Sequence, residues 1–249
     1  MAKLKGKVAV VSGASKGIGA GIAEELAKEG AAVVVNYASS PDKANAVVAR
    51  IREAGGEAIA VRADLSKPAE GRALIEAAIS KFGRLDILVN NAGVYEFLPL
   101  QDVSEEHYDR IFDLNVKGLL FATQAAANAF GTRGGVIINI SSVVSLAGGP
   151  AMSVYSATKA AVDSLTRTLA AELGPRNILI NSVLPGPVET EGVHGLAEWK
   201  GLVDQVVPRT PLGRVGQPRD IATVVSFLAS EDARWITGQV IPVAGGLRA

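Results

Sequence analysis

Tyr155 and Lys159 lie four residues apart, and together they could carry out acid catalysis. On a helix this spacing places the phenol and the ammonium on one face. A free tyrosine has a pKa near ~10, and a cation about 4 Å away stabilises the phenolate by roughly 4 kcal/mol, enough to lower the pKa by about three units. The pair therefore predicts a general acid that works near neutral pH. The same pattern also fits any exposed helix face, so it needs support from the rest of the chain.

A glycine-rich turn follows the first apolar run, Val8–Ser12, and begins an alanine-rich helix. Glycines in such a turn let the backbone approach a pyrophosphate, and the helix N-terminus supplies free N–H groups. A turn needed only for packing is the alternative. The residues predicted to bind phosphate here are Gly13, Ser15, Lys16, Gly17, Ile18 and Gly19.

The end of the second predicted strand indicates which dinucleotide binds. An acidic residue there would accept the ribose hydroxyls of NAD, and this chain has no carboxylate at that place. Because Lys16 can reach the same corner, we expect NADP(H) rather than NAD(H). Asp64, after the third strand, either contacts the adenine, caps the next helix, or does both. The cofactor-binding residues predicted at this end are Asn36, Tyr37, Ala38, Ser39, Asp64 and Leu65.

Short β-branched runs alternate with longer segments of helical period along the whole chain, which predicts a single α/β domain over residues 1–249. The expected fold is a doubly wound, mostly parallel sheet of seven strands, with ligands at the carboxyl ends of the strands. The predicted strands are Val8–Ser12, Ala32–Tyr37, Ala58–Arg62, Asp86–Asn90, Val136–Ser141, Ile178–Leu184 and Val240–Val243. The predicted helices are Gly19–Glu29, Asp42–Ala54, Ala69–Phe82, Ser104–Ala129, Val154–Leu173 and Pro218–Ser230.

One segment, at about 187–217, does not follow this alternation. It is rich in proline and glycine and offers only a weak helical stretch near 195–207. Long irregular connections in compact domains are usually functional or disordered. We therefore expect a lid over the substrate pocket.

Composition argues against several classes of function. The formal net charge is zero and no basic run is present, which argues against nucleic-acid binding. The chain shows neither a signal peptide nor an apolar stretch of membrane-spanning length, so no membrane role is expected. With no cysteine, and only His107 and His194 as histidines, we expect neither disulfides nor a metal site, and a cytoplasmic location.

With these motifs assembled, the chain resembles the short-chain dehydrogenase/reductase family over nearly its whole length. The similarity lies in the turn Ser12–Gly19, in Asn90-Asn-Ala-Gly93, in Asn115 followed by Val-Lys-Gly, and in the spacing of Ser142, Tyr155 and Lys159. The segment Pro185–Thr190 resembles the one that lines the family's nicotinamide pocket. Within the family, 3-oxoacyl-(acyl carrier protein) reductases and related NADP-dependent carbonyl reductases are the most similar. Relatives commonly carry an aspartate where this chain has Ala244, which leaves the usual C-terminal contacts open.

The resemblance implies a Rossmann fold and a role for each matching residue. Tyr155 would protonate the carbonyl oxygen, Ser142 would hold it, and Lys159 would bind the nicotinamide ribose and lower the pKa of the tyrosine. Asn115 would anchor a water, or else make a purely structural hydrogen bond. Ser141 and Ser142 leave a strand in opposite directions, and the spacing to Tyr155 selects Ser142. The further residues implied to border the cofactor are Asn91, Ala92, Gly93, Pro185, Gly186, Val188 and Thr190.

The sequence is compatible with two classes of substrate. Arg133 and Arg176 lie where carrier-dependent relatives dock an acidic acyl carrier protein, which favours an acyl thioester. An apolar pocket wall favours instead a plain ketone or secondary alcohol and a broad-specificity reductase. Its predicted residues are Val94, Tyr95, Phe97, Val143, Val144, Leu146, Val154, His194 and Trp199. A dinucleotide sensor without turnover is a third hypothesis, and the resemblance also implies a homotetramer.

Overall fold

The central element is one sheet of seven parallel strands, in the order β3-β2-β1-β4-β5-β6-β7. The structure is a computed structural model that describes residues 2–192 and 199–247. The strands are β1 (Val8–Val11), β2 (Ala32–Tyr37), β3 (Glu57–Arg62), β4 (Ile87–Asn90), β5 (Gly135–Ile140), β6 (Ile178–Pro185) and β7 (Val240–Val243). The strand order reverses between β1 and β4, so the sheet is doubly wound as predicted, a Rossmann fold.

β1 is apolar throughout and β4 is apolar up to its last residue, Asn90, because both faces of these strands are covered. All four residues of β1 and all four of β4 are buried. Continuous β-branched runs of this kind are typical of parallel strands packed between helical layers. The parallel register aligns their carboxyl ends, where the glycine turn and the segment after Asn90 leave the sheet.

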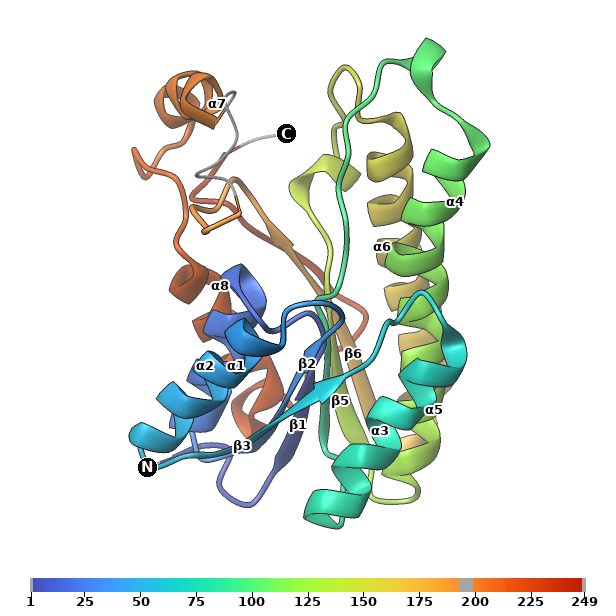
Figure 1. Cartoon of the computed structure of the whole chain (residues 1–249), viewed down its shortest axis with the longest axis vertical. Coiled ribbons are helices and arrows are strands. Elements are labelled where there is room, and N and C mark those ends of the chain that lie inside the picture. Colours follow the sequence, from blue (N-terminus) through green and yellow to red (C-terminus); the bar gives the residue numbers. More distant parts are fainter. Residues whose placement is uncertain (1, 193–198, 248–249) are drawn as a thin grey trace.

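Figure 1 shows the helices in two layers, with α1, α2 and α8 on one side of the sheet and α3, α4, α5 and α6 on the other. Each layer has its own apolar core, one around Ile22, Leu26 and Val225, the other around Leu74, Phe130 and Ile137. Helix α7 lies beyond the strand ends, apart from both layers (Figure 1). The helices are α1 (Gly17–Lys28), α2 (Pro41–Glu53), α3 (Pro68–Phe82), α4 (Glu105–Phe112), α5 (Leu119–Phe130), α6 (Ser153–Leu173), α7 (Trp199–Val206) and α8 (Pro218–Ala229).

The helix predicted over Ser104–Ala129 is not one regular α-helix. A π-helical turn, Asp113–Gly118, separates α4 from α5 and contains Asn115. At its end, a Cβ on Gly118 would lie 2.4 Å from the backbone oxygen of Leu65, so only glycine allows this approach. π-turns inside helices are frequent at functional sites.

Within the described part of the chain, no helix is long and apolar enough to cross a membrane. The same residues contain no group of three or more histidine, aspartate or glutamate side chains placed to hold a metal ion.

Candidate active site

Tyr155 and Ser142 meet at the carboxyl end of β5, as their spacing predicted. Tyr155 lies in the first turn of α6, and Ser142 follows β5 and begins a short 3-10 turn. Burial raises the pKa of Tyr155, and the neighbouring Ser142 hydroxyl opposes this rise in part. Ser141 faces the other way, because its hydroxyl is buried and donates to the backbone oxygen of Lys159 at 3.2 Å. Ser142 is therefore the serine left beside Tyr155, and its contact with a substrate stays a prediction.

Lys159 lies one helical turn after Tyr155 and is almost fully buried. Its Nζ donates to the backbone oxygen of Ile140 at 2.9 Å and lies 5.6 Å from the centre of the Tyr155 ring. Burial lowers the pKa of Lys159 to about 8, and the buried carboxylate of Asp163, a further turn along α6, acts in the opposite direction. The ammonium is therefore still mostly charged at neutral pH.

The predicted effect of Lys159 on Tyr155 is wrong in this structure. Burial raises the pKa of Tyr155 to about 12, and hydrogen bonding with Ser142 only partly opposes this. The sequence-based prediction used a near-surface dielectric and ignored desolvation, which favours the neutral phenol. Tyr155 therefore keeps its proton at neutral pH, and it can still donate that proton to an alkoxide, which is a stronger base than a phenolate.

Asn115 has a structural role that the sequence left open. Its side-chain oxygen accepts from the backbone nitrogen of Val94 at 2.9 Å, and its Nδ2 donates to the Val94 oxygen at 2.9 Å and to Thr158 at 3.2 Å. Thr158 in turn donates to the backbone oxygen of Tyr155 at 2.7 Å. The amide thus joins the segment after β4 to the start of α6, and its contact with a water stays a prediction.

The glycine turn packs against the segment after β4 so closely that a side chain would collide there. A Cβ on Gly13 would lie 2.8 Å from the Cα of Ala92, and one on Gly19 would lie 2.4 Å from the side-chain nitrogen of Asn91. The Asn91 amide donates to the backbone oxygens of Ser12 and Gly13, at 2.9 and 3.0 Å. The backbone of this turn and the N-terminus of α1 therefore fit a dinucleotide pyrophosphate.

The residues near the turn also lead towards the reacting groups. A Cβ on Gly93 would lie 3.1 Å from the side-chain oxygen of Asn115 and 3.7 Å from the Nζ of Lys159. Gly17 approaches the lid segment, since a Cβ added to it would lie 3.4 Å from the Thr190 side chain. Gly93 thus adjoins Lys159, and Gly17 adjoins Thr190. Ser15, Lys16 and Ile18 complete the surface of the turn, and Lys16 is exposed.

Asn36 supports the turn through its side chain. That side chain is buried, accepts from the backbone nitrogen of Gly13 at 3.0 Å, and donates to the oxygens of Val61 and Ala63 at 3.3 and 3.0 Å. The amide therefore holds the turn in place, and a contact of Asn36 with the cofactor stays a prediction. Tyr37 is part-buried, and Ala38 and Ser39 are exposed at the end of β2.

Arg62 is a cation at this corner that the sequence reasoning missed. It pairs with Tyr37 in the parallel register of β2 and β3, and its Nε donates to the backbone oxygen of Ala38 at 3.2 Å. A basic residue at the predicted end of the third strand was the available signal.

Two other predicted residues at the adenosine end are occupied by local structure. The Asp64 carboxylate accepts from the backbone nitrogen and the hydroxyl of Ser66, at 3.1 and 2.7 Å, so it caps this turn and not α3. Leu65 is buried in the apolar core, and only its backbone reaches the π-turn at Gly118.

The two ends of the predicted lid, at about 187–217, lie side by side and form an isolated bridge between Val188 and Gly216. The backbone of Pro187 and Glu189 exchanges hydrogen bonds with Gly216, at 2.9 and 2.8 Å. Val188 is buried, and Gly186 packs against Ala244, where an added Cβ would lie 2.8 Å from the Ala244 Cβ. Pro185 ends β6. His194, expected in the pocket wall, lies outside the described residues, and the lid's closure stays a prediction.

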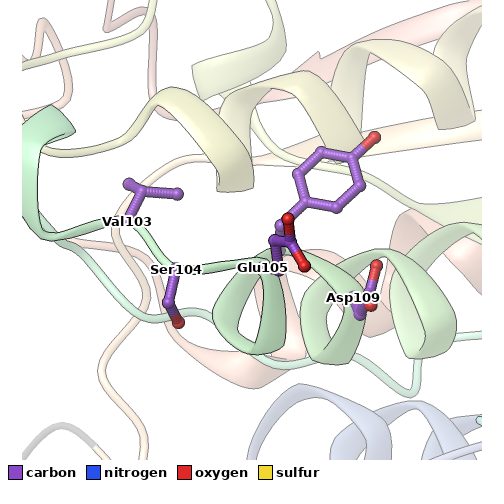
Figure 2. A pocket seen from close by; sticks show the side chains of 5 residues that line it. Val103, Ser104, Glu105 and Asp109 are labelled. Atoms are coloured by element: carbon purple, nitrogen blue, oxygen red, sulfur yellow. The ribbon is translucent and has the colours of Figure 1, made fainter.

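A surface hollow of about 340 Å³ lies at the start of α4 and contains none of the predicted site residues. Figure 2 shows Val103, Ser104, Glu105 and Asp109 along it. The hollow is open to solvent, and its charged side chains are the carboxylates of Glu105 and Asp109. We therefore assign no catalytic role to it.

Comparison with known proteins gives consistent similarities. A family model described as enoyl-(acyl carrier protein) reductase matches residues 13–248. An uncharacterized oxidoreductase of Methylorubrum extorquens is 60% identical over 100% of both chains. A probable tetrahydroxynaphthalene reductase of Zymoseptoria tritici is 43% identical over 98% of this chain and 95% of its own. The 3-oxoacyl-[acyl-carrier-protein] reductase FabG of Staphylococcus epidermidis is 43% identical over 97% and 98%.

Solved structures show the same relationship. A short-chain dehydrogenase/reductase from Serratia marcescens superposes with a TM-score of 0.94 at 40% identity, covering 99% of this chain and 100% of its own. A short chain dehydrogenase from Burkholderia cenocepacia in complex with NADP gives a TM-score of 0.92 at 38% identity, covering 99% and 100%.

Proposed function

Because the chain belongs to the short-chain dehydrogenase/reductase family, we propose that it uses NADPH to reduce a ketone to a secondary alcohol. The observation that carries the proposal is the arrangement of Tyr155, which lies beside Ser142 and is followed one turn later by a buried ammonium. A bound NADPH supplies the hydride, while the protein supplies position, charge and a proton.

Each residue of the site then has a defined task. Ser142 and Tyr155 hold the carbonyl oxygen, and Tyr155 gives it a proton as negative charge develops there. The Lys159 ammonium stabilises the phenolate that remains, and Gly93 leaves space beside Lys159 for a ribose. The glycine turn and the N-terminus of α1 hold the pyrophosphate.

NADP(H) is preferred over NAD(H) in this proposal, since Lys16 and Arg62 offer two cations where the 2′-phosphate would lie and no carboxylate competes. We expect Arg62→Gln to weaken NADP⁺ binding by roughly tenfold, as loss of a charge-assisted hydrogen bond does, and to leave NAD⁺ binding unchanged. Calorimetric titration of both dinucleotides measures these affinities. Arg72→Gln, at an exposed position on α3, is the matched control. Equal affinities of the wild type for the two cofactors would contradict the preference.

The substrate is either a 3-oxoacyl thioester or a plain ketone. Printed names of relatives include both a 3-oxoacyl-[acyl-carrier-protein] reductase and a tetrahydroxynaphthalene reductase. Arg176 is less available to dock a carrier protein than expected. Its guanidinium donates to the backbone oxygen of Ala127 at 2.7 Å and thereby caps α5. Arg133 remains exposed.

The test of the function is NADPH oxidation with an acetoacetyl thioester and, in parallel, an unactivated hydrophobic ketone. Preference for the thioester supports an oxoacyl reductase, and equal or better turnover of the ketone supports a broader carbonyl reductase. Bound cofactor without turnover of either compound would support the dinucleotide sensor instead.

We also propose a homotetramer. Strand β7 is an edge of the sheet, and the nearby Trp235 is 96% exposed, which is unusual for tryptophan in a monomer. The exposed side of α6 carries small residues, Ala157, Ala160, Ser164 and Ala171, that permit close helix packing. Light scattering is expected to give about four times the chain mass of 25.7 kDa, and a monomer mass would rule the assembly out.

A further inference from the structure

Three aromatic rings from two segments meet beside the reacting hydroxyl. Tyr95 and Phe97, here called the aromatic wall, follow β4, and their ring centres lie 5.8 Å apart. Both rings meet the Tyr155 ring edge-on, with centres 6.2 and 5.9 Å from it. These separations fall in the range of favourable aromatic pairs, which extends from about 4.5 to 7 Å.

The two rings of the aromatic wall are only partly buried by the rest of the protein. Tyr95 is 48% exposed and Phe97 is 45% exposed, whereas Phe130 in the core is fully buried. Apolar ring surface left accessible next to a polar reacting group is typical of a ligand site. The wall thus offers ring faces to a molecule whose carbonyl oxygen lies at Tyr155.

The backbone holds the aromatic wall in place on both sides. Val94, before the wall, makes two hydrogen bonds with the Asn115 amide, and the backbone nitrogen of Leu98, after it, donates to the backbone oxygen of Ala151 at 2.9 Å. Successive residues of an extended segment point to opposite sides, so Tyr95 and Phe97 share one side. A wall fixed in this way needs no ordering when a ligand binds, which favours affinity.

Glu96, between the two rings, anchors the segment to α4. Its carboxylate forms an ion pair with Arg110 and lies 4.0 Å from the buried ring of His107. The pairing also neutralises the one charged side chain of residues 94–98. The wall itself therefore presents apolar surface and no cation for an anionic carrier.

We propose that the aromatic wall makes this enzyme selective for ketones that carry an aryl ring one methylene away from the reacting carbonyl. The proposal rests on the proposed ketone reduction and narrows its substrate. The aryl ring lies against Tyr95 and Phe97 while Ser142 and Tyr155 hold the carbonyl oxygen.

The test uses two ketones whose carbonyls are equally reactive, 1-phenylpropan-2-one and 1-cyclohexylpropan-2-one. Neither carbonyl is conjugated, so their rates differ through ring recognition alone. We expect kcat/KM of the wild type to favour the phenyl compound by about tenfold, the effect of one to two aromatic contacts. The Tyr95→Leu/Phe97→Leu double variant is expected to bring this ratio close to one.

Two further variants distinguish a loss of ring recognition from a general loss of structure or activity. Phe227→Leu changes an aromatic side chain that is 40% exposed on α8, in the opposite layer, and should keep the wild-type ratio. Arg110→Met removes the partner of Glu96 and should raise KM for the phenyl ketone with kcat unchanged, which marks Arg110 as a positioning residue.

A binding measurement distinguishes failure of this proposal from failure of the proposed function. Calorimetric titration with the two corresponding alcohols, in the presence of NADP⁺, needs no turnover. A preference for the phenyl alcohol that the double variant loses supports the wall even if neither ketone is reduced. Equal rates for both ketones, or equal binding of both alcohols, would overturn the selectivity and leave ketone reduction standing.

Discussion

Tyr155→Phe is expected to reduce kcat for ketone reduction by roughly 10²- to 10⁴-fold, the contribution that a positioned proton donor makes. The change removes one oxygen and keeps the ring that packs against Tyr95 and Phe97. Without the phenol, Ser142 still contacts the carbonyl oxygen, but the charge that develops there receives no proton. NADPH binding, measured by calorimetry, should not change.

Tyr108→Phe is the control for this experiment. Tyr108 is 46% exposed and stacks on Phe112, with ring centres 4.3 Å apart, so its hydroxyl takes no part in the site. This variant should retain the wild-type kcat. Substantial activity in Tyr155→Phe, together with normal folding by circular dichroism, would show that another group donates the proton.

Lys159→Met is expected to lower kcat by roughly 10²- to 10³-fold, as removal of a group that stabilises developing charge does. Methionine fills most of the space of the lysine stem but has no charge to stabilise the Tyr155 phenolate. Since burial lowers the pKa of Lys159 to about 8, the wild-type rate should fall as the pH rises above about 8 and the ammonium loses its proton. The residual activity of the variant should lack that decline.

Stability provides the folding control for Lys159→Met. The pKa of Lys159 lies below its ordinary value of 10.5, so the folded protein disfavours the charged form. The cost, roughly 3 kcal/mol for a shift of this size, is fully present below about pH 8 and disappears as the pH rises to 10.5. The variant should therefore be at least as stable as the wild type at pH 7, by thermal or urea unfolding. The exposed Lys81→Met should change neither rate nor stability, and a variant less stable at pH 7 would contradict this view of Lys159.

Hydrophobic periodicity predicted all seven strands and the order of the helices, because continuous apolar runs and helical repeats depend on local sequence. The π-turn around Asn115 could not be predicted in this way. It accompanies a contact between Gly118 and the backbone of Leu65, more than fifty residues away along the chain. The helix-period pattern before and after it is ordinary.

Spacing also predicted that Tyr155, Lys159 and Ser142 gather at the strand ends, and the structure places them there, while their catalytic roles stay predictions. Their electrostatics were not predictable from spacing. The pKa of Tyr155 depends on how much water its neighbours exclude, and Tyr95 and Phe97 come from a segment about sixty residues upstream.

Individual polar residues were hardest to assign. Asn36 fits a ligand-binding position by sequence, yet its side-chain amide bonds to the backbone of Gly13, Val61 and Ala63. The sequence predicts Arg62 only as the last residue of a strand. The pairing of Arg62 with Tyr37 in the sheet places its side chain beside Ala38. The role of a polar residue can be assigned only when its hydrogen-bond partners within the fold are known.

The most direct test of the central claim is transfer of deuterium from NADPH labelled at C4 to a ketone. The enzyme would be incubated with the labelled cofactor and 1-phenylpropan-2-one, and the product analysed by mass spectrometry. We expect a secondary alcohol that carries one deuterium on the carbinol carbon, and at most about one hundredth as much of it with Tyr155→Phe over the same time. Oxidation of NADPH without deuterated alcohol, or binding of NADPH without any product from either the ketone or an acetoacetyl thioester, would contradict it.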